Sequence, residues 1–277
     1  MSEGVEALAL RLETSLRELG SVVVAYSGGV DSAVVLAAAL RELPGRALAL
    51  MALSPSFPPW EEASARAQVL ALGGELLAVR TEELTDERYR LNLGDRCYHC
   101  KNALFEACEI ARAQRGFAHI AYGAHLGDLG ENRPGHAAAM LLGVRAPLVD
   151  CAMDKPEVRA LARHYALPSA EKAAMACLSS RFPRGVAVSE DRLAQVARAE
   201  MALHALGFAD VRVRHDGTGA RVEVAARDLG RLESDEMREN LARAVRAEGF
   251  ARVLLDLDGY LSGGADSRNA RRLRVLA

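Results

Sequence analysis

The sequence predicts an α/β fold: a doubly wound, mostly parallel sheet with a small C-terminal α+β domain. Two observations support this prediction. Short apolar runs of strand length alternate with helical patterns between residues 5 and 149, as they do in βαβ units. Near Pro168 the pattern changes, and strictly alternating segments follow. We therefore expect one domain at residues 1–178 and a second, smaller one at residues 179–277.

The first domain is expected to begin with a helix, because apolar residues recur at helical spacing over residues 5–19. The run that starts at Val22 is apolar and β-branched, which is typical of a strand covered on both faces. A polar turn and a helix that starts at or near Ser32 come next. The remaining expected elements are a helix at 60–72 and strands at 47–53, 76–79, 118–122 and 146–149.

The second domain is expected to combine two long helices with a hairpin and one more strand. Residues 211–214 and 221–224 alternate strictly between apolar and polar, and Asp-Gly-Thr-Gly at 216–219 supplies a hairpin turn. The helices are expected at residues 190–206 and about 229–248, and the strand at 252–257. The tail at 262–270 is rich in Gly, Ser and Asn and is expected to be loose.

The composition limits the classes of function. Lys and Arg number 35 against 37 Asp and Glu, a net charge of −2, so no general attraction to nucleic acid is expected. No apolar run has transmembrane length, and the first residues lack the order of a signal peptide. Five cysteines, an odd number, suit a reducing compartment better than a disulfide framework. We expect a cytoplasmic protein without a membrane partner.

The turn Ser-Gly-Gly-Val-Asp-Ser at residues 27–32 is the strongest chemical signal. Gly28 and Gly29 allow a sharp turn and a close approach to a ligand. Free N–H groups at the start of the next helix favour an anion such as phosphate. The turn carries neither a Walker A lysine nor a Rossmann glycine pattern. The plain alternative is a strand-turn-helix in which Asp31 or Ser32 only caps the helix.

Cysteines mark two further stretches. Cys97-x-x-Cys100 suits a redox pair, a zinc half-site or cluster ligands, and His99 between them could equally be a surface residue. Cys177 precedes two serines and an arginine, which would lower the pKa of the thiol and hold an acidic group; a buried linker cysteine is the alternative. Core positions are the better interpretation for Cys108 and Cys151.

Polar residues also follow other strands of the first domain. Ser54 stands in a Ser-Pro-Ser turn after the second strand, where open α/β sheets bind ligands. Gly123, Asp128 and Arg133 follow the strand at 118–122. Asp128 and Arg133 are candidates to contact a nucleotide or a substrate.

Together these stretches resemble the PP-loop ATP pyrophosphatases, and among them the LarE-type sulfur transferases that mature the nickel-pincer nucleotide cofactor of lactate racemase. The resemblance implies that ATP is cleaved to AMP and pyrophosphate to adenylate a carboxylate of a pyridinium dicarboxylate mononucleotide, whose oxygen is then replaced by sulfur. We also expect a homo-oligomer. The motifs that carry the resemblance are residues 27–32, Asp-Arg-Cys-x-x-Cys-Lys at 95–101, Arg-Pro-Gly-His at 133–136 and Cys-Leu-Ser-Ser-Arg at 177–181.

The resemblance assigns roles to individual residues. ATP and Mg²⁺ are expected at the loop, where Mg²⁺ offsets repulsion between Asp31 and the phosphates. The expected nucleotide-binding residues are Ser27, Gly28, Gly29, Asp31, Ser32, Ser54, Gly123, Asp128 and Arg133. The expected catalytic residues are Asp31, Cys177, Ser180 and Arg181. The expected substrate-binding residues are Arg181, Arg212, Arg214 and Glu200; Glu200 and the region of Asp228 are candidates to help bind either a metal or the substrate.

Arg212 and Arg214 stand at i, i+2 on a strand, so both lie on one face while Val211 and Val213 point to the core. The resemblance implies that both arginines reach the phosphate of the substrate. The alternative is that they form a solvated polar face. Departures from the family pattern fall at residues 123–128 and 169–173, where Gly-Ala-His, Gly-Asp and Ser-Ala-Glu-Lys-Ala replace the more usual residues.

Two sources of sulfur are compatible with these cysteines. Cys177 alone could attack the acyl adenylate and then lose its sulfur, which leaves dehydroalanine. Cys97, Cys100 and Cys177 together could instead hold a [4Fe–4S] cluster with one open iron, and we favour this route.

Two other functions remain open from the sequence. A tRNA-thiolating enzyme would use the same loop but needs a basic RNA-binding surface, against which the acidic balance argues. A nucleotide-binding regulatory protein without catalysis is the other, and the intact Ser27, Asp31 and Ser32 argue against it.

Overall fold

The computed structural model describes residues 4–129, 134–172 and 176–260. Arg133 and the tail expected to be loose at 262–270 lie outside the described residues. The chain divides into two compact units. The first comprises Met1–Glu83 and Asp95–Met175, and the second comprises Leu84–Gly94 and Ala176–Ala277.

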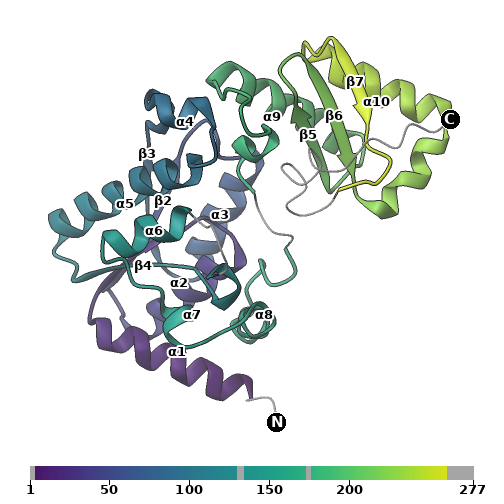
Figure 1. Ribbon diagram of the computed structural model, residues 1–277. Helices are drawn as coiled ribbons and strands as arrows, with labels where there is room; N and C mark the ends of the chain where they lie inside the picture. The colour runs from purple at the N-terminus through teal and green to yellow at the C-terminus, as the bar shows by residue number, and fades with distance from the viewer. Residues whose placement is uncertain (1–3, 130–133, 173–175, 261–277) are drawn as a thin grey trace. The chain divides into compact units, whose positions relative to one another are not determined.

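The first unit is built on a parallel sheet with the strand order β3-β2-β1-β4 (Figure 1). The strands are β1 (Val22–Ala25), β2 (Ala47–Leu53), β3 (Glu75–Arg80) and β4 (His119–Tyr122). Its helices are α1 (Val5–Leu19), α2 (Val30–Glu42), α3 (Pro59–Ala71), α5 (Arg96–Arg115), α6 (Pro134–Leu141), α7 (Pro147–Asp150) and α8 (Lys155–His164).

Helices cover both faces of this sheet, which confirms the doubly wound α/β prediction. Side chains alternate between the faces of a strand. Val22 and Val24 of β1 accordingly pack in a core with α1, α2 and α8, whereas Val23 and Ala25 pack in a second core with α5 and α6. Cys151 belongs to the first core and Cys108 to the second, as expected.

The predicted strand at 146–149 is wrong. In place of a strand, the structure has a single bridge between Arg145 and Ala121 of β4, and α7 begins at Pro147. Proline lacks the N–H that a strand ladder would use, and its fixed φ suits the first turn of a helix. Pairing therefore ends where the proline begins.

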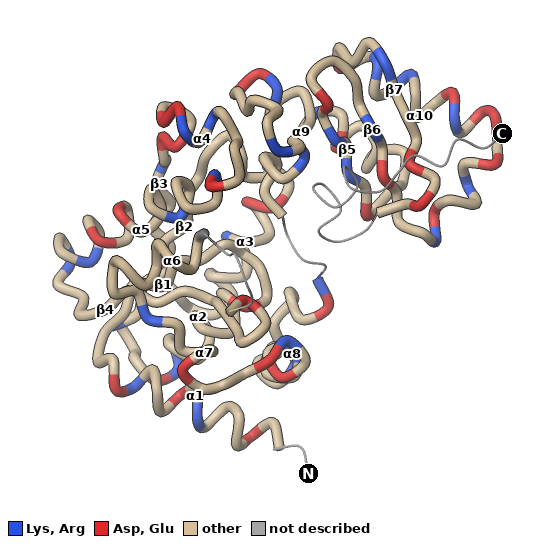
Figure 2. The backbone as a smooth tube through the Cα atoms, in the orientation of Figure 1, with Lys and Arg blue, Asp and Glu red and all other residues tan. Residues whose placement is uncertain are grey.

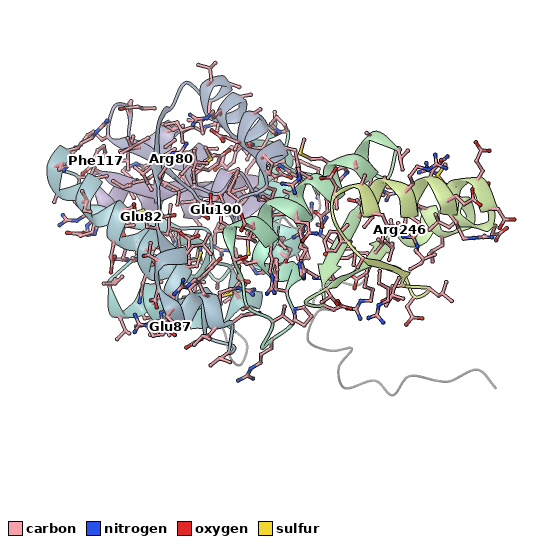
Figure 3. All side chains as sticks on the ribbon, turned by 90° about the horizontal axis from the view of Figure 1, so that it is seen from above. Arg80, Glu82, Glu87, Phe117, Glu190 and Arg246 are labelled. Atoms are coloured by element: carbon pink, nitrogen blue, oxygen red, sulfur yellow. The ribbon has the colours of Figure 1, made fainter. Side chains whose placement is uncertain are left out.

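The second unit holds a small mixed sheet with the order β5-β6-β7. β5 (Val211–His215) and β6 (Gly219–Val224) form the predicted antiparallel hairpin, and β7 (Arg252–Leu255) adds to β6 in parallel. The long helices are α9 (Glu190–Ala205) and α10 (Asp235–Ala247). Arg246 lies in the last turn of α10, where a cation complements the helix dipole (Figure 3).

The helix expected at about 229–248 is interrupted. Residues Ala226–Glu233 form a 3-10 helix, and α10 starts only at Asp235. The cause is Ser234, whose side chain accepts a hydrogen bond from the Met237 N–H and caps a new helix.

An earlier segment of the chain completes the second unit. α4 (Glu87–Leu91) is tied to the 3-10 helix at Leu178–Arg181 by a 2.6 Å hydrogen bond between the buried hydroxyls of Tyr89 and Ser179. The Asn92 amide donates to the carbonyls of Phe182, Pro183 and Val186. Among the described residues, no helix is both long enough and apolar enough to cross a membrane.

Candidate active site

The turn between β1 and α2 is held in shape by its own serines. The Ser32 hydroxyl accepts from the Ser27 N–H at 3.2 Å and donates to the Gly29 carbonyl at 3.1 Å. Gly28 adopts φ +78°, and a Cβ there would lie 2.7 Å from that of Ala65, so the position requires glycine. The helix begins at Val30, two residues before Ser32, with Gly29 as its N-cap.

Gly123, the residue that follows β4, packs closely against this turn. A Cβ on Gly123 would lie 2.6 Å from the carbonyl carbon of Asp31 and 2.8 Å from the Cα of Ser32. Only glycine leaves room for that backbone contact. The predicted nucleotide-binding residue Gly123 is thus brought directly to the loop.

Asp31 has a partner that the sequence analysis missed. The Lys155 ammonium contacts both carboxylate oxygens, at 2.6 and 2.8 Å. Lys155 is the first residue of α8, whose start is fixed by a capping box between Asp154 and Glu157. The capping residues could have located this helix start in the sequence, but nothing in the sequence indicated that the lysine reaches Asp31.

Asp128 lies in the 3-10 turn Leu126–Asp128 that follows β4. Its carboxylate accepts from the His125 N–H at 3.1 Å and lies 3.4 Å from the His125 ring. The Leu126 N–H donates to the Met153 carbonyl, two residues before Lys155. This turn is therefore connected to the start of α8.

Ser54 and Ser56, after β2, bond to each other through their hydroxyls at 2.8 Å. Ser56 also donates to Glu83 at 3.3 Å. Glu83 is buried, and its other carboxylate oxygen has no hydrogen-bond partner in the part of the chain that the structure describes. Ser54 is thus placed at the carboxyl edge of the sheet, beside a buried carboxylate that the sequence did not reveal.

Two of the family motifs meet in the first unit. A Cβ on Gly135 would lie 2.9 Å from the Lys101 side chain, and the Lys101 ammonium lies 6.0 Å from the centre of the Tyr122 ring. The Tyr122 hydroxyl bonds to His136, and burial raises the pKa of Tyr122 to about 12. Motif residues that are distant in sequence therefore pack together.

Cys97 and Cys100 lie in the first turns of α5, exposed and half-buried respectively. His99 is not a surface residue: it is buried and lies 3.3 Å from Asp95, one helical turn earlier. Cys177 is half-buried and belongs to the second unit. Within the described ranges, no group of three or more His, Cys, Asp or Glu side chains is arranged to hold a metal ion.

Arg181 is the most buried basic side chain among the described residues of the second unit. It forms a two-pronged ion pair with Glu200 of α9, at 2.9 and 2.8 Å, and these side chains are 1% and 0% exposed. The same guanidinium donates to the carbonyls of Ala176 and Cys177, at 2.7 and 3.0 Å. Arg181 therefore holds the backbone at Cys177, one of the expected catalytic residues.

Arg214 forms a second buried pair, with Glu223 of β6 at 3.1 and 2.9 Å. It also donates to the Ser180 carbonyl at 2.7 Å. Val211 and Val213 are fully buried, as the alternation predicted. Arg214 itself is buried too, which excludes a solvated polar face at that position.

Arg212 is half-buried, with its guanidinium 5.0 Å from the centre of the Tyr260 ring. Burial, and next the charge of Arg181, lower the pKa of Arg212, so the guanidiniums of this unit lie close enough to interact. Asp228 pairs with Arg231 at 3.3 Å.

The contacts of this unit join Arg181, Arg214 and Glu200 in one network with Ser180 and Cys177.

No protein-family model matches the chain. A curated relative from Synechocystis sp., an uncharacterised protein, is 38% identical over 89% of this chain and 92% of its own length. The pyridinium-3,5-bisthiocarboxylic acid mononucleotide synthase of Lactiplantibacillus plantarum is 35% identical over 91% of both chains. An uncharacterised protein of Methanocaldococcus jannaschii is 24% identical over 91% of this chain. The chain therefore belongs to the LarE-type family of pyridinium-3,5-bisthiocarboxylic acid mononucleotide synthases, as its motifs indicated.

Proposed function

We propose that this chain adenylates a carboxylate of a pyridinium dicarboxylate mononucleotide with ATP, releases pyrophosphate, and replaces a carboxylate oxygen with sulfur. The observation that carries the proposal is the relationship to a synthase named for a bisthiocarboxylic acid mononucleotide, over 91% of both chains. Conversion of a carboxylate to a thiocarboxylate requires activation of an oxygen as a leaving group, and adenylation provides it.

The loop between β1 and α2 supports the ATP half of the reaction. Directly after its glycines a helix of 13 residues begins, and such a helix start attracts phosphate. Mg²⁺ would be held by Asp31 together with the phosphates, and would screen the charge of the leaving pyrophosphate. The Asp31 carboxylate is 25% exposed, so it is accessible to a cation.

The second unit supports the substrate half. Guanidiniums donate in a fixed fork that suits phosphate and carboxylate. Arg181 and Arg214 already bind buried carboxylates and backbone carbonyls. Arg212, which contacts an aromatic ring rather than a carboxylate, is the best candidate to bind the substrate phosphate. Ser180 would orient the carboxylate next to Cys177.

For the sulfur itself we propose the cluster route. Cys97 is exposed, and Cys100 and Cys177 are half-buried; the three thiolates would hold a [4Fe–4S] cluster, which would supply the sulfide that replaces the oxygen. In the competing route the Cys177 thiolate displaces AMP and forms a thioester. Loss of the Cα proton and cleavage of the Cβ–S bond then give the thiocarboxylate and dehydroalanine.

The test is anaerobic purification, followed by iron analysis, absorption spectroscopy and incubation with ATP, the mononucleotide and inorganic sulfide. We expect pyrophosphate and AMP in equal amounts, a thiocarboxylate by mass spectrometry, and several turnovers per chain. A colourless, iron-free protein that transfers sulfur once and loses the mass of H₂S would refute the cluster route alone. Absence of pyrophosphate release would refute the whole proposal.

In the part of the chain that the structure describes, no feature favours a tRNA-thiolating enzyme. Figure 2 shows acidic and basic positions interspersed along the chain in both units, in line with the net charge of −2. A tRNA-binding surface would gather basic side chains. Binding of bulk tRNA that weakens steeply with salt would contradict this interpretation.

A further inference from the structure

Tyr122, His136 and Lys101 form a group, the Tyr122 cluster, that the proposed ATP and sulfur chemistry leaves unused. Tyr122, the last residue of β4, bonds through its hydroxyl to Nδ1 of His136 on α6. Lys101 of α5 lies over the same tyrosine ring, with its ammonium 6.0 Å from the ring centre. α5 and α6 pack against each other on one face of the sheet (Figure 1). One strand and two helices therefore fix the position of this cluster.

The Tyr122 cluster lies next to the loop at which ATP is proposed to bind. Gly123 follows Tyr122 in the chain, and a Cβ on Gly123 would lie 2.6 Å from the carbonyl carbon of Asp31. The strand end that carries the cluster is thus packed against the loop. Adenylation joins a carboxylate oxygen to the α-phosphorus of ATP, so the carboxylate of the substrate has to lie beside this loop during the reaction.

The hydrogen bond between Tyr122 and His136 determines which ring nitrogen of the histidine carries the proton. Burial, and next the charges of Asp128 and Asp150, raise the pKa of Tyr122 to about 12, so the phenol keeps its proton near neutral pH and donates it. Nδ1 of His136 is then the acceptor, which leaves the proton of the neutral ring on Nε2. In the part of the chain that the structure describes, no acceptor contacts this Nε2–H.

Lys101 brings a positive charge to the same place. Its half-buried ammonium lies 5.7 Å from the centre of the Phe105 ring and 6.0 Å from that of Tyr122. A Cβ on Gly135 would lie 2.9 Å from the Lys101 side chain, so the lysine stem packs closely against the start of α6. Aromatic rings attract a cation but do not neutralise it. Among the described residues no carboxylate pairs with Lys101, and an anionic ligand would supply the countercharge.

A hydrogen-bond donor and a cation beside one strand end suit a carboxylate, because hydrogen bonds to an ionised group are the strong ones. We infer that the Tyr122 cluster binds the carboxylate that ATP activates: His136 donates its Nε2–H to a carboxylate oxygen, Lys101 supplies the countercharge, and Tyr122 positions the His136 ring. This inference rests on the proposed function. It adds a site for the carboxylate in the first unit to the proposed phosphate site at Arg212.

Steady-state pyrophosphate release from the full chain tests the site, with the mononucleotide varied at saturating MgATP. His136→Leu removes the donor and leaves an apolar side chain, so the KM for the mononucleotide should rise at least about tenfold, as expected for loss of a hydrogen bond to a charged group. His136→Gln places an amide N–H near the position of Nε2 and should stay within about threefold of the wild type. The affinity for MgATP, measured by calorimetry, should be unchanged in both variants.

His164→Leu is the matched control. His164 also lies against a tyrosine, with its ring centre 5.3 Å from that of Tyr165, but it is exposed at the end of α8. Its KM should equal that of the wild type, and circular dichroism should show all variants folded. A wild-type KM in His136→Leu would overturn the inference and leave the proposed function intact. A loss of MgATP affinity without a change in this KM would assign the cluster to the phosphates of ATP and would also overturn it. Absence of pyrophosphate release from the wild type would overturn the proposed function itself.

Nitrogen NMR of protein labelled at histidine tests the geometry without turnover. The His136 signals are those that disappear in His136→Gln. We expect the proton on Nε2, and we expect this N–H signal to move when the mononucleotide is added. Tyr122→Phe removes the bond to Nδ1 and should raise the KM, but by less than His136→Leu does. A proton on Nδ1, or an Nε2–H signal that saturating mononucleotide leaves unchanged, would refute the assignment.

Discussion

Removal of Glu200 is expected to destabilise the second unit strongly. Glu200 and Arg181 are 0% and 1% exposed and share two hydrogen bonds. Glu200→Ala would leave the guanidinium buried without its countercharge, which costs about 3–5 kcal/mol in comparable pairs. The Val213 N–H would also lose its acceptor, 2.8 Å away, at a further cost of about 1–3 kcal/mol. The expected loss in the free energy of unfolding is therefore at least about 3 kcal/mol.

The measurement is urea unfolding followed by circular dichroism. With a dependence of about 1–3 kcal/mol per molar urea, the midpoint should fall by about 1–3 M. The chain has a single tryptophan, Trp60 in α3 of the first unit. Its fluorescence shows whether the loss is confined to the second unit.

Glu248→Ala is the control. Glu248 pairs at 2.7 Å with Arg198, which lies on α9 as Glu200 does, but the Arg198 side chain is 56% exposed. Its loss should stay below about 1 kcal/mol. If Glu200→Ala shifts the midpoint no more than Glu248→Ala does, the buried pair with Arg181 is not the support that the geometry indicates.

Asp31→Ala should leave the fold intact, because its ion pair is partly exposed, and should abolish pyrophosphate release; release at the wild-type rate would exclude the loop as the ATP site. Gly123→Ala should weaken MgATP binding at least tenfold, because the new Cβ would lie 2.8 Å from the Ser32 Cα. Unchanged binding would show that the backbone shifts to accommodate the Cβ without disturbing the loop. Arg212→Ala should weaken mononucleotide binding without loss of the fold, and equal affinity would exclude it from the substrate site. Burial lowers the pKa of His215. Its contribution to the free energy of unfolding is therefore fully present above the unfolded-state pKa of about 6.5 and is lost as the pH falls below that value. His215→Gln should flatten the dependence of the urea midpoint on pH in this range.

The fold was predictable because its signals are local. Apolar runs in the strands of the first sheet, strict alternation in the β5–β6 hairpin and helical spacing in residues 5–19 arise within single elements, so no knowledge of contacts was required. The run at 146–149 was misjudged because four apolar residues have no period that separates a strand from a helix. Pro147 was the usable signal, since proline at that point favours a helix start.

The site was only partly predictable because its decisive contacts are tertiary. The turn at residues 27–32 was recognisable from its own residues, yet the partner of Asp31 comes from Lys155, 124 positions away. Spacing also predicted that Arg214 shares a face with Arg212. It could not show that Arg214 would be buried and would form an ion pair with Glu223 on the neighbouring strand. Burial depends on what packs over a side chain, and a single sequence does not contain that information.

These buried pairs bear on the proposal that the second unit binds an anionic substrate. Arg181 and Arg214 each have a carboxylate partner that is 0% exposed, Glu200 and Glu223, so their positive charges are largely compensated within the fold. Their remaining donors bind backbone carbonyls of the segment that contains Cys177 and Ser180. They are therefore better suited to position that segment than to attract a substrate from solution. Arg212 lies beside them without such a carboxylate bond among the described contacts, and its pKa is lowered first by burial and next by repulsion from the positive charge of Arg181. A substrate phosphate would relieve that repulsion, which makes Arg212 the group of the three with most to gain from binding an anion.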